Sequence, residues 1–230
     1  MINFYFPSVF LMAYCFLFPL SYNFDKYRVA NTYVRLIHST GCVLKLAPIL
    51  YHNNFIIMDP TQKMIMNDNV KHVLDRSIYF FLWDCIALFI ANEDDKLTYV
   101  SHHLISALAL WFSRYFEYDW YLICLSLFLA EITNPLTQIS EMYVILEKEN
   151  IYFEKFYLYS MFLVRGLITP SLGIFYSQHI YKNYEYLRNM YLCSVLINYS
   201  IMNILFIGSV NWIHKKYLVL YKNNNDKKVS

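Results

Sequence analysis

A small set of ionisable side chains lies inside long apolar stretches of this 230-residue chain. The set comprises His38, Lys45, Asp84, His102, His103, Glu131 and Arg165. A charge at membrane depth costs several kcal/mol, so each of these groups is expected to face a partner or a polar cavity. The fixed charges balance, with two basic and two acidic residues. The set therefore either forms structural ion pairs between helices or lines a polar cleft that holds a ligand.

The adjacent pair His102 and His103 offers the side chains best suited to acid–base or nucleophilic chemistry near neutral pH. Successive residues of a helix point about 100° apart, so the two rings cannot readily face one ligand. We expect one histidine to contact a ligand beside a structural partner, or both to be structural. A metal site is not expected, because ligands on one helix face need a spacing such as HxxxH, which is absent among the seven histidines.

Helix-breaking residues follow two of the charged positions. Asn134 and Pro135 come after Glu131, and Gly166, Pro170 and Gly173 come after Arg165. A proline frees the backbone carbonyl four residues earlier, which here belongs to Glu131 and to Gly166. Broken helices at membrane depth are tolerated where they line a cavity or are buried in protein. The pattern favours a ligand cavity, and a simple packing kink is the alternative.

The composition indicates the solvent that must surround these residues. Hydrophobic residues make up 58% of the chain and charged residues 16%, with a mean hydropathy of +0.31. A soluble domain carries about a quarter charged residues, so this chain is expected to reside in lipid. Continuous apolar runs predict helices rather than a barrel, because a barrel needs two-residue alternation. The sequence contains no basic stripe of the kind that nucleic acid requires, so a nucleic-acid partner is not expected.

Seven apolar stretches have roughly the 20 residues that a membrane span requires. They cover residues 3–22, 30–51, 77–91, 97–116, 120–139, 156–178 and 191–213. The third is short unless it starts near Val73, and the first lacks the basic leader of a signal peptide. The predicted fold is therefore an all-α, polytopic membrane helical bundle of about seven transmembrane helices.

The distribution of Lys and Arg predicts the orientation of this bundle. With seven spans, eleven basic residues fall on the side of the C-terminus and six on the other, which favours a cytoplasmic C-terminus. We divide the chain into an N-terminal transmembrane helix at 1–28, a core domain at 29–216 and a cytoplasmic basic tail at 217–230. Lys227 and Lys228 match a dilysine signal for return to the endoplasmic reticulum, and an ordinary basic tail is the alternative.

Several of these motifs, in this order, resemble the TLC-domain family of membrane proteins, which includes translocation-associated membrane proteins and ceramide synthases. The motifs are RLIHST at 35–40, YFFLWD at 79–84, DK at 95–96, SHH at 101–103, LAEITNP at 129–135, VR at 164–165 and NW at 211–212. The later motifs are most similar to the transmembrane protein 56-like branch. The resemblance covers roughly residues 31–216 and implies a six-helix core preceded by the N-terminal helix.

The resemblance implies two kinds of activity. Ceramide synthases transfer an acyl group from acyl-CoA to a sphingoid amine, using paired histidines and a later Asp-x-x-Asp. The corresponding stretch here is Glu131-x-x-Asn134, which lacks one carboxylate that could orient or deprotonate a catalytic histidine. The other branches are associated with the homeostasis of membrane lipids.

The leading hypothesis is therefore a multi-pass protein of the endoplasmic reticulum membrane that binds or senses an acyl lipid in an intramembrane polar cleft. The predicted lipid-binding residues are Asp84, His102, His103, Glu131, Asn134 and Arg165. The alternative is an acyl-CoA-dependent acyltransferase with His102, His103 and Glu131 as catalytic residues and acyl-CoA as co-substrate. A membrane chaperone or trafficking scaffold is the third hypothesis. The expected partners are membrane lipids or acyl chains, no cofactor or metal is expected, and a homo-oligomer is compatible with the sequence.

Overall fold

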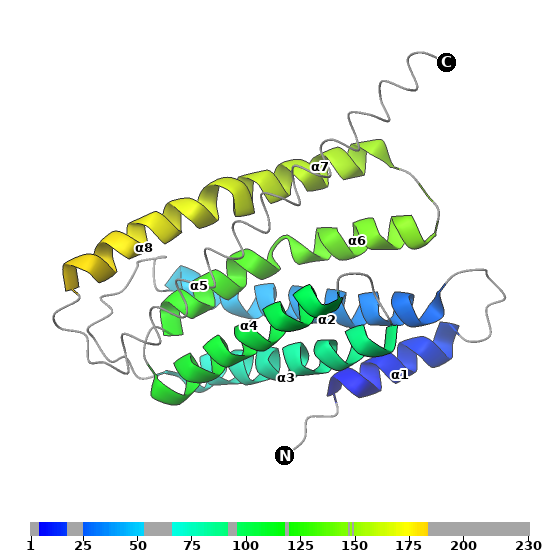
Figure 1. The fold of residues 1–230 in the computed structure, drawn as a ribbon, viewed down its shortest axis with the longest axis horizontal. Helices are drawn as coiled ribbons and strands as arrows, with labels where there is room; N and C mark the ends of the chain where they lie inside the picture. Colours follow the sequence, from blue (N-terminus) through cyan, green and yellow to red (C-terminus); the bar gives the residue numbers. More distant parts are fainter. Residues whose placement is uncertain are drawn as a thin grey trace, which may run out of the picture.

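The computed structural model describes residues 5–17, 25–52, 66–91, 96–117, 120–146, 148 and 150–183, and nearly all of them are helical. The helices are α1 (Tyr5–Leu17), α2 (Lys26–His52), α3 (Asp68–Ala91), α4 (Lys96–Phe116), α5 (Trp120–Glu131), α6 (Asn134–Ile145), α7 (Ile151–Met161), the π-helical segment η1 (Phe162–Ile168) and α8 (Thr169–Asn183) (Figure 1). No strand occurs in these ranges, so the predicted all-α class is confirmed for them. The seventh predicted span and the predicted tail lie outside the described residues, and the seven-span count stays a prediction.

Two stretches of the described chain are long and apolar enough to cross a membrane by length and composition. They are Trp120–Ile145, which joins α5 to α6, and Ile151–Phe175, which runs from α7 through η1 into α8. The helices α2, α3 and α4 contain 27, 24 and 21 residues, so each reaches the length of a span. The third predicted span was too short, since α3 already begins at Asp68.

Helix α2 lies at the centre of the bundle and packs against α1, α3, α5 and α6. Its buried side chains recur every three or four residues, which places them on one helical face. This stripe consists of Asn31, Val34, His38, Cys42, Leu46 and Leu50. In the half of the stripe nearer the start of α2, Asn31 and His38 are polar and Val34 is apolar, and the other half is apolar apart from Cys42. Asn31 and His38 are therefore positioned to meet polar side chains from neighbouring helices.

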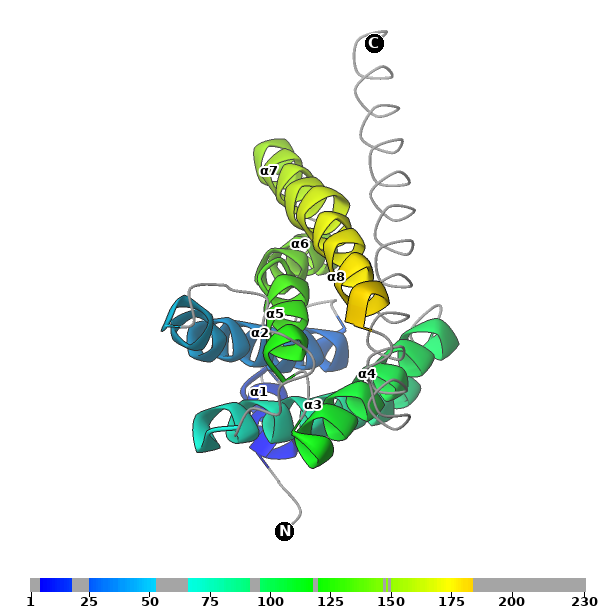
Figure 2. The same ribbon diagram turned by 90° about the vertical axis from the view of Figure 1, so that its left-hand side faces the viewer.

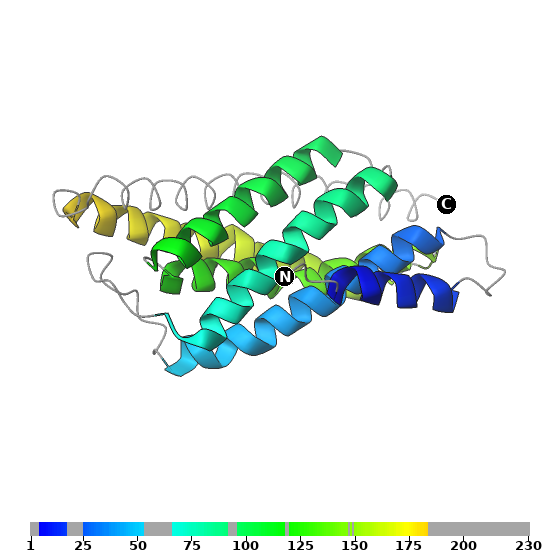
Figure 3. The ribbon, with the colours of Figure 1, turned by 90° about the horizontal axis from the view of Figure 1, so that it is seen from below.

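Helices α3 and α4 form an antiparallel pair that lies along one side of the bundle (Figure 3). Asp75 pairs with Arg114 at 3.1 Å between the start of α3 and the end of α4. At the opposite end of the bundle, Arg28 at the start of α2 pairs with Glu141 of α6 at 3.0 Å. The helices α2, α3 and α4 thus alternate in direction, as successive spans must.

The two longest apolar stretches are both interrupted, as the helix breakers predict. Helix α5 ends at Glu131, and α6 begins at Asn134 with Pro135 in its first turn. The segment η1 is π-helical and ends just before Pro170 at the start of α8. The stretch α7–η1–α8 lies over α5 and α6 on the side of the bundle away from α1 (Figures 1 and 2). Both interruptions contain residues of the predicted site.

Side-chain polarity is inverted relative to a water-soluble fold. Leu44 and Tyr159 are 70% and 71% exposed, whereas Asp84 and Glu131 are only 1% and 2% exposed. Large exposed apolar side chains occur along α2, α3, α4, α7 and η1. Apolar groups on the outside and carboxylates on the inside are the distribution expected in lipid.

Candidate functional site

The carboxylate of Asp84 on α3 is held by side chains of two other helices. Arg35 of α2 donates from Nε to Oδ1 at 2.9 Å, and Asn31, one turn earlier, donates from Nδ2 to the same oxygen at 3.4 Å. From α4, Nδ1 of His103 lies 3.1 Å from Oδ2. Because Asn31 and Arg35 are four residues apart, they share one face of α2. Three helices thus meet at one buried negative charge.

Only one member of the histidine pair contacts this carboxylate. His103 and Asp84 lie at ion-pair distance, although the Nδ1–H bond is not aligned as in a hydrogen bond. When Nδ1 carries the ring proton, that nitrogen is the one nearest Asp84 and Nε2 is the basic ring nitrogen. The ring of His102 is half-buried beside that of His103, with 5.3 Å between their centroids and 53° between their planes. The two rings therefore have different surroundings, as their adjacency on a helix requires.

A second polar cluster forms at the break between α5 and α6. Asn134 donates from Nδ2 to Oε2 of Glu131 at 2.9 Å, and its Oδ1 accepts a hydrogen bond from Nη2 of Arg165 on η1. In the described part of the chain, the guanidinium makes no ion pair with a carboxylate. The amide of Asn134 links Arg165 to Glu131, because an amide can accept from one group and donate to the other.

Arg165 also fixes the backbone of the helix break. Its Nη2 donates to the carbonyl of Ala130 at 2.7 Å, and its Nε donates to the hydroxyl of Thr133 at 2.9 Å. The last carbonyls of a helix have no partner within the helix, and Ala130 belongs to the last turn of α5. The π-helical turn around Arg165 is itself closed by Thr169, whose hydroxyl donates to the carbonyl of Val164 at 2.8 Å. Arg165 therefore joins two irregular segments of the chain.

His38 lies between the two polar clusters. Its ring is buried and stacks on Phe80 with 3.7 Å between centroids and 8° between planes. Its Nε2 lies 3.8 Å from Oε1 of Glu131, and neither ring nitrogen has a hydrogen-bond partner. Phe81, next to Phe80, contacts the ring of His103 at 5.2 Å. An aromatic layer thus separates the Asp84 cluster from the Glu131 cluster.

The predicted site residues fall into these two clusters, with His102 beside the first. Lys45, which the sequence placed among the intramembrane charges, is exposed on α2 and belongs to neither. Sequence reasoning did not assign Asn31 or Arg35 to the site. The spacing of Asn31, Arg35 and His38 at i, i+4 and i+7 places these polar side chains on one face of a largely apolar helix, and this pattern could have indicated them.

The arrangement suits polar recognition and proton transfer more than metal chemistry. Within the described ranges, no three His, Cys, Asp or Glu side chains converge as a metal site needs. The Asp84–His103 contact instead offers a carboxylate that orients an imidazole, which is the arrangement of a general base or of a hydrogen-bond donor to a ligand. The Glu131 cluster offers a guanidinium at a helix break.

Comparison with known proteins identifies one family. The sequence model of the TLC-domain family matches residues 28–215, which is most of the chain. No curated protein matches the chain in the corresponding search.

Proposed function

Because the chain belongs to the TLC-domain family, whose members are membrane proteins linked to lipid metabolism and sensing, we propose that it is a multi-pass protein of lipid homeostasis. It binds or senses an acyl lipid at a polar site inside the helix bundle. The observation that carries this proposal is the buried Asp84–His103 contact, with His102 half-buried beside it. A few polar groups in an apolar surround are what fixes the orientation of a lipid-like ligand.

Each polar group of the first cluster has a role in this proposal. His103, oriented by Asp84, donates or accepts at the carbonyl or headgroup of the lipid through Nε2. His102 contacts the same ligand from the neighbouring direction, because its ring is partly open to the surroundings. Arg35 holds the carboxylate of Asp84 in place, so that the imidazole has a fixed partner.

The second cluster contributes the far wall of the proposed lipid site. Glu131 and Asn134 are bonded to each other, and Arg165 is bonded to Asn134 and to the backbone. The Nη1 group of Arg165 makes no hydrogen bond to the described residues, so it is available for an anionic group of the ligand. In this role Arg165 both positions the helix break and attracts the lipid.

Acyl-CoA-dependent acyl transfer is a second candidate, and the same Asp84–His103 contact favours it. In this mechanism Nε2 of His103 takes a proton from an amine or hydroxyl as that group attacks the thioester carbon. The carbon–sulfur bond then breaks, and coenzyme A leaves as a thiol with that proton. Asp84 occupies the orienting position here, whereas Glu131 contacts Asn134 and lies near His38.

Comparative lipidomics of cells that lack the protein tests this function. We expect wild type to restore an altered class of acyl lipid, and His102→Ala/His103→Ala not to restore it at equal expression. His72→Ala is the matched control, because His72 is exposed near the start of α3. Acyl transfer additionally predicts that the acceptor accumulates as its product falls. Equal rescue by the double variant contradicts a role of the pair in lipid handling.

We also propose the finer assignments of branch and location. The chain belongs with the transmembrane protein 56-like branch, on the motifs at 129–135 and 164–165. It resides in the endoplasmic reticulum with a cytoplasmic C-terminus, supported by the basic-residue asymmetry and the Lys227-Lys228 motif. Replacing both lysines by serine is expected to release a tagged protein to later secretory compartments, as microscopy would show.

A further inference from the structure

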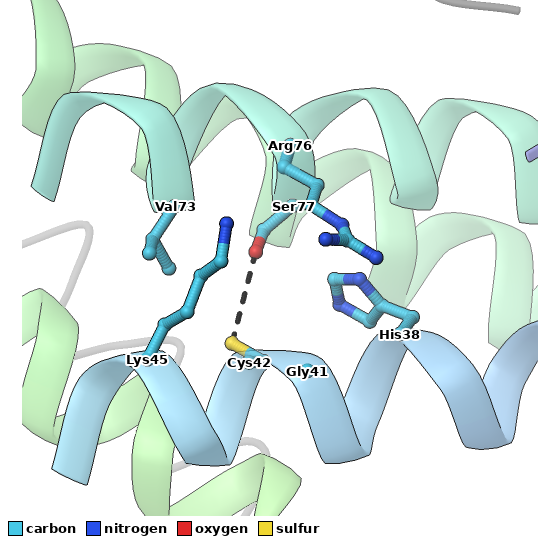
Figure 4. A pocket seen from close by; sticks show the side chains of 7 residues that line it. All are labelled: His38, Gly41, Cys42, Lys45, Val73, Arg76 and Ser77. Atoms are coloured by element: carbon cyan, nitrogen blue, oxygen red, sulfur yellow. Dashed lines mark hydrogen bonds between the residues drawn. The ribbon is translucent and has the colours of Figure 1, made fainter. Parts of the chain in front are cut away.

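A small recess lies between α2 and α3, away from Asp84. It is lined by His38, Gly41, Cys42, Lys45, Val73, Arg76 and Ser77 (Figure 4). Its volume is about 10 Å³, which is roughly the space that one water molecule needs. The recess itself is therefore too small for an acyl chain or a whole phosphate group, and it admits a single oxygen atom of a larger polar group.

Two cations meet at this recess without a carboxylate partner in the described part of the chain. Figure 4 shows the ammonium of Lys45 and the guanidinium of Arg76 directed into the space between the two helices. Arg76 lies over the ring of Tyr5, with its Cζ 4.6 Å from the centroid. By contrast, nearby basic residues are paired with acids, as Lys71 is with Glu117 at 3.2 Å. Two adjacent positive charges repel each other, so an anion between them is favourable.

A buried polar side chain also faces the recess without a hydrogen-bond partner. His38 is 1% exposed, and neither of its ring nitrogens forms a hydrogen bond to a described residue, although Nε2 lies 3.8 Å from Oε1 of Glu131. Buried polar groups in proteins are usually satisfied, so an unsatisfied ring at a recess points to a missing ligand. Gly41 keeps the space open, since a Cβ there would lie 3.6 Å from Nη2 of Arg76. Ser77 adds a hydroxyl, now 3.9 Å from the sulfur of Cys42.

The two cations lie at a similar distance from the same end of the bundle. Lys45 lies seven residues before the end of α2, and Arg76 lies eight residues after the start of α3. At 1.5 Å per residue, they are about 10 and 12 Å from the same end of the bundle. Long basic side chains reach from this depth to the interface. Next to Lys45, Leu44 is 70% exposed on the outer surface, so the recess adjoins a surface suited to acyl chains.

We propose that Lys45 and Arg76, which line this recess, bind the phosphate group of a membrane phospholipid, with one phosphate oxygen entering the recess. The guanidinium of Arg76 and the ammonium of Lys45 provide charge-assisted hydrogen bonds to the phosphate oxygens, while Ser77 and His38 supply additional donors. The acyl chains of the lipid lie along the exposed apolar side of α2. This site is separate from the Asp84–His103 contact, and it assigns the protein a second lipid contact near one end of the bundle.

Native mass spectrometry of the full-length protein in detergent tests this site. The probes are phosphatidic acid and diacylglycerol with identical acyl chains, which differ only in the phosphate. Wild type is expected to bind phosphatidic acid roughly tenfold more tightly, as charge-assisted hydrogen bonds imply. Lys45→Gln/Arg76→Gln is expected to abolish most of this difference. The charge-retaining swap Lys45→Arg/Arg76→Lys is expected to keep it.

The matched control is Lys71→Gln/Arg114→Gln, which removes the same charge from two basic residues that are already paired with acids at the same end of the bundle. An equal loss in this control overturns the proposal, as does equal binding of both lipids to wild type. Excess inorganic phosphate distinguishes the source of the phosphate. Persistence of the bound lipid supports a phospholipid, whereas its displacement assigns the recess to a soluble phosphate and overturns the lipid assignment. All variants must elute like wild type in size exclusion.

Discussion

At the scale of single residues, the buried carboxylates of Asp84 and Glu131 have different partners. Asp84 is paired with Arg35 and lies at ion-pair distance from His103. Glu131 receives one amide hydrogen bond, from Asn134, and has His38 nearby at 3.8 Å. Removing one partner of a buried ion pair leaves an uncompensated charge, so the two sites should respond differently to substitution.

The ion pair of Asp84 predicts a large loss of stability on Arg35→Gln. Breaking a buried pair costs about 3–5 kcal/mol, whereas a solvated surface pair contributes about 0–1 kcal/mol. Arg114→Gln is the matched change, because the side chains of Arg114 and Asp75 are 32% and 45% exposed. Thermal unfolding in detergent measures both variants. Equal shifts in Tm would show that the Asp84 cluster does not contribute to stability as we infer.

Ceramide synthases carry a carboxylate at the position that corresponds to Asn134. The hydrogen bonds of the Asn134 amide predict how introducing that carboxylate would affect stability. Asn134→Asp removes the donor to Glu131 and places a second carboxylate beside it, so we expect a loss of about 1–3 kcal/mol. Asn67→Asp is the control, because the side chain of Asn67 acts only as an acceptor among the described residues, from the backbone N–H of Val70 at the start of α3. Thermal unfolding compares the two. Acyltransferase activity that appears only in Asn134→Asp would show that the natural protein is not a synthase.

At the scale of elements, the irregular segments carry the site while the regular helices hold it. The break between α5 and α6 presents the carbonyl of Ala130 to Arg165, and η1 sets the position of Arg165 itself. π-Helical turns occur frequently at functional sites. The regular helices α2, α3 and α4 contribute one side chain or more each to the Asp84 cluster.

Gly166 in η1 should not tolerate a side chain as a regular helical glycine does. A Cβ at Gly166 lies 3.3 Å from the ring of Phe162, which is tighter than an ordinary contact. Alanine normally stabilises a helix by about 1 kcal/mol relative to glycine, but Gly166→Ala is expected to give no such gain. Unfolding in detergent checks this, and a gain of about 1 kcal/mol would contradict the distinct role of η1.

The sequence predicted some helices and their interruptions closely. Apolar run length placed α2 and α4 to within four residues at each end, and the positions of Pro135 and Pro170 predicted the two breaks. The span predicted for 120–139 is the pair α5 and α6, which ends at Ile145. The start of α3 was missed because Asp68 to Arg76 is rich in charge, which hides a helix from a hydropathy window. The pairing of Asp84 with Arg35 also escaped prediction, since the register between α2 and α3 is a tertiary property.

At the scale of the whole molecule, the contacts divide the bundle into two ends. Lys71–Glu117 and Asp75–Arg114 join helices at one end, and Arg28–Glu141 joins them at the other. Helix α2 ends and helix α3 begins at the first of these ends. The predicted orientation places this end on the lumenal side and the Asp84 cluster in the cytoplasmic half of the membrane.

Glycosylation mapping tests this orientation. An Asn-x-Thr acceptor inserted in the connection at 53–65 should be modified in the endoplasmic reticulum, since that connection is predicted to be lumenal. The same acceptor appended after Ser230 should remain unmodified on the cytoplasmic side. The readout is a mobility shift that endoglycosidase removes. Modification of the appended acceptor would reverse the predicted orientation.

Photo-cross-linking with an acyl chain that carries a diazirine and an alkyne tests the lipid-binding claim most directly. The chain is incorporated into cellular lipids, and the full-length protein is purified and mapped by peptide mass spectrometry. We expect labels near His102 and His103 and on η1, reduced several-fold in His102→Ala/His103→Ala and unchanged in His72→Ala. Labels confined to outward-facing side chains such as Leu44 and Tyr159, and equal in all variants, would contradict it.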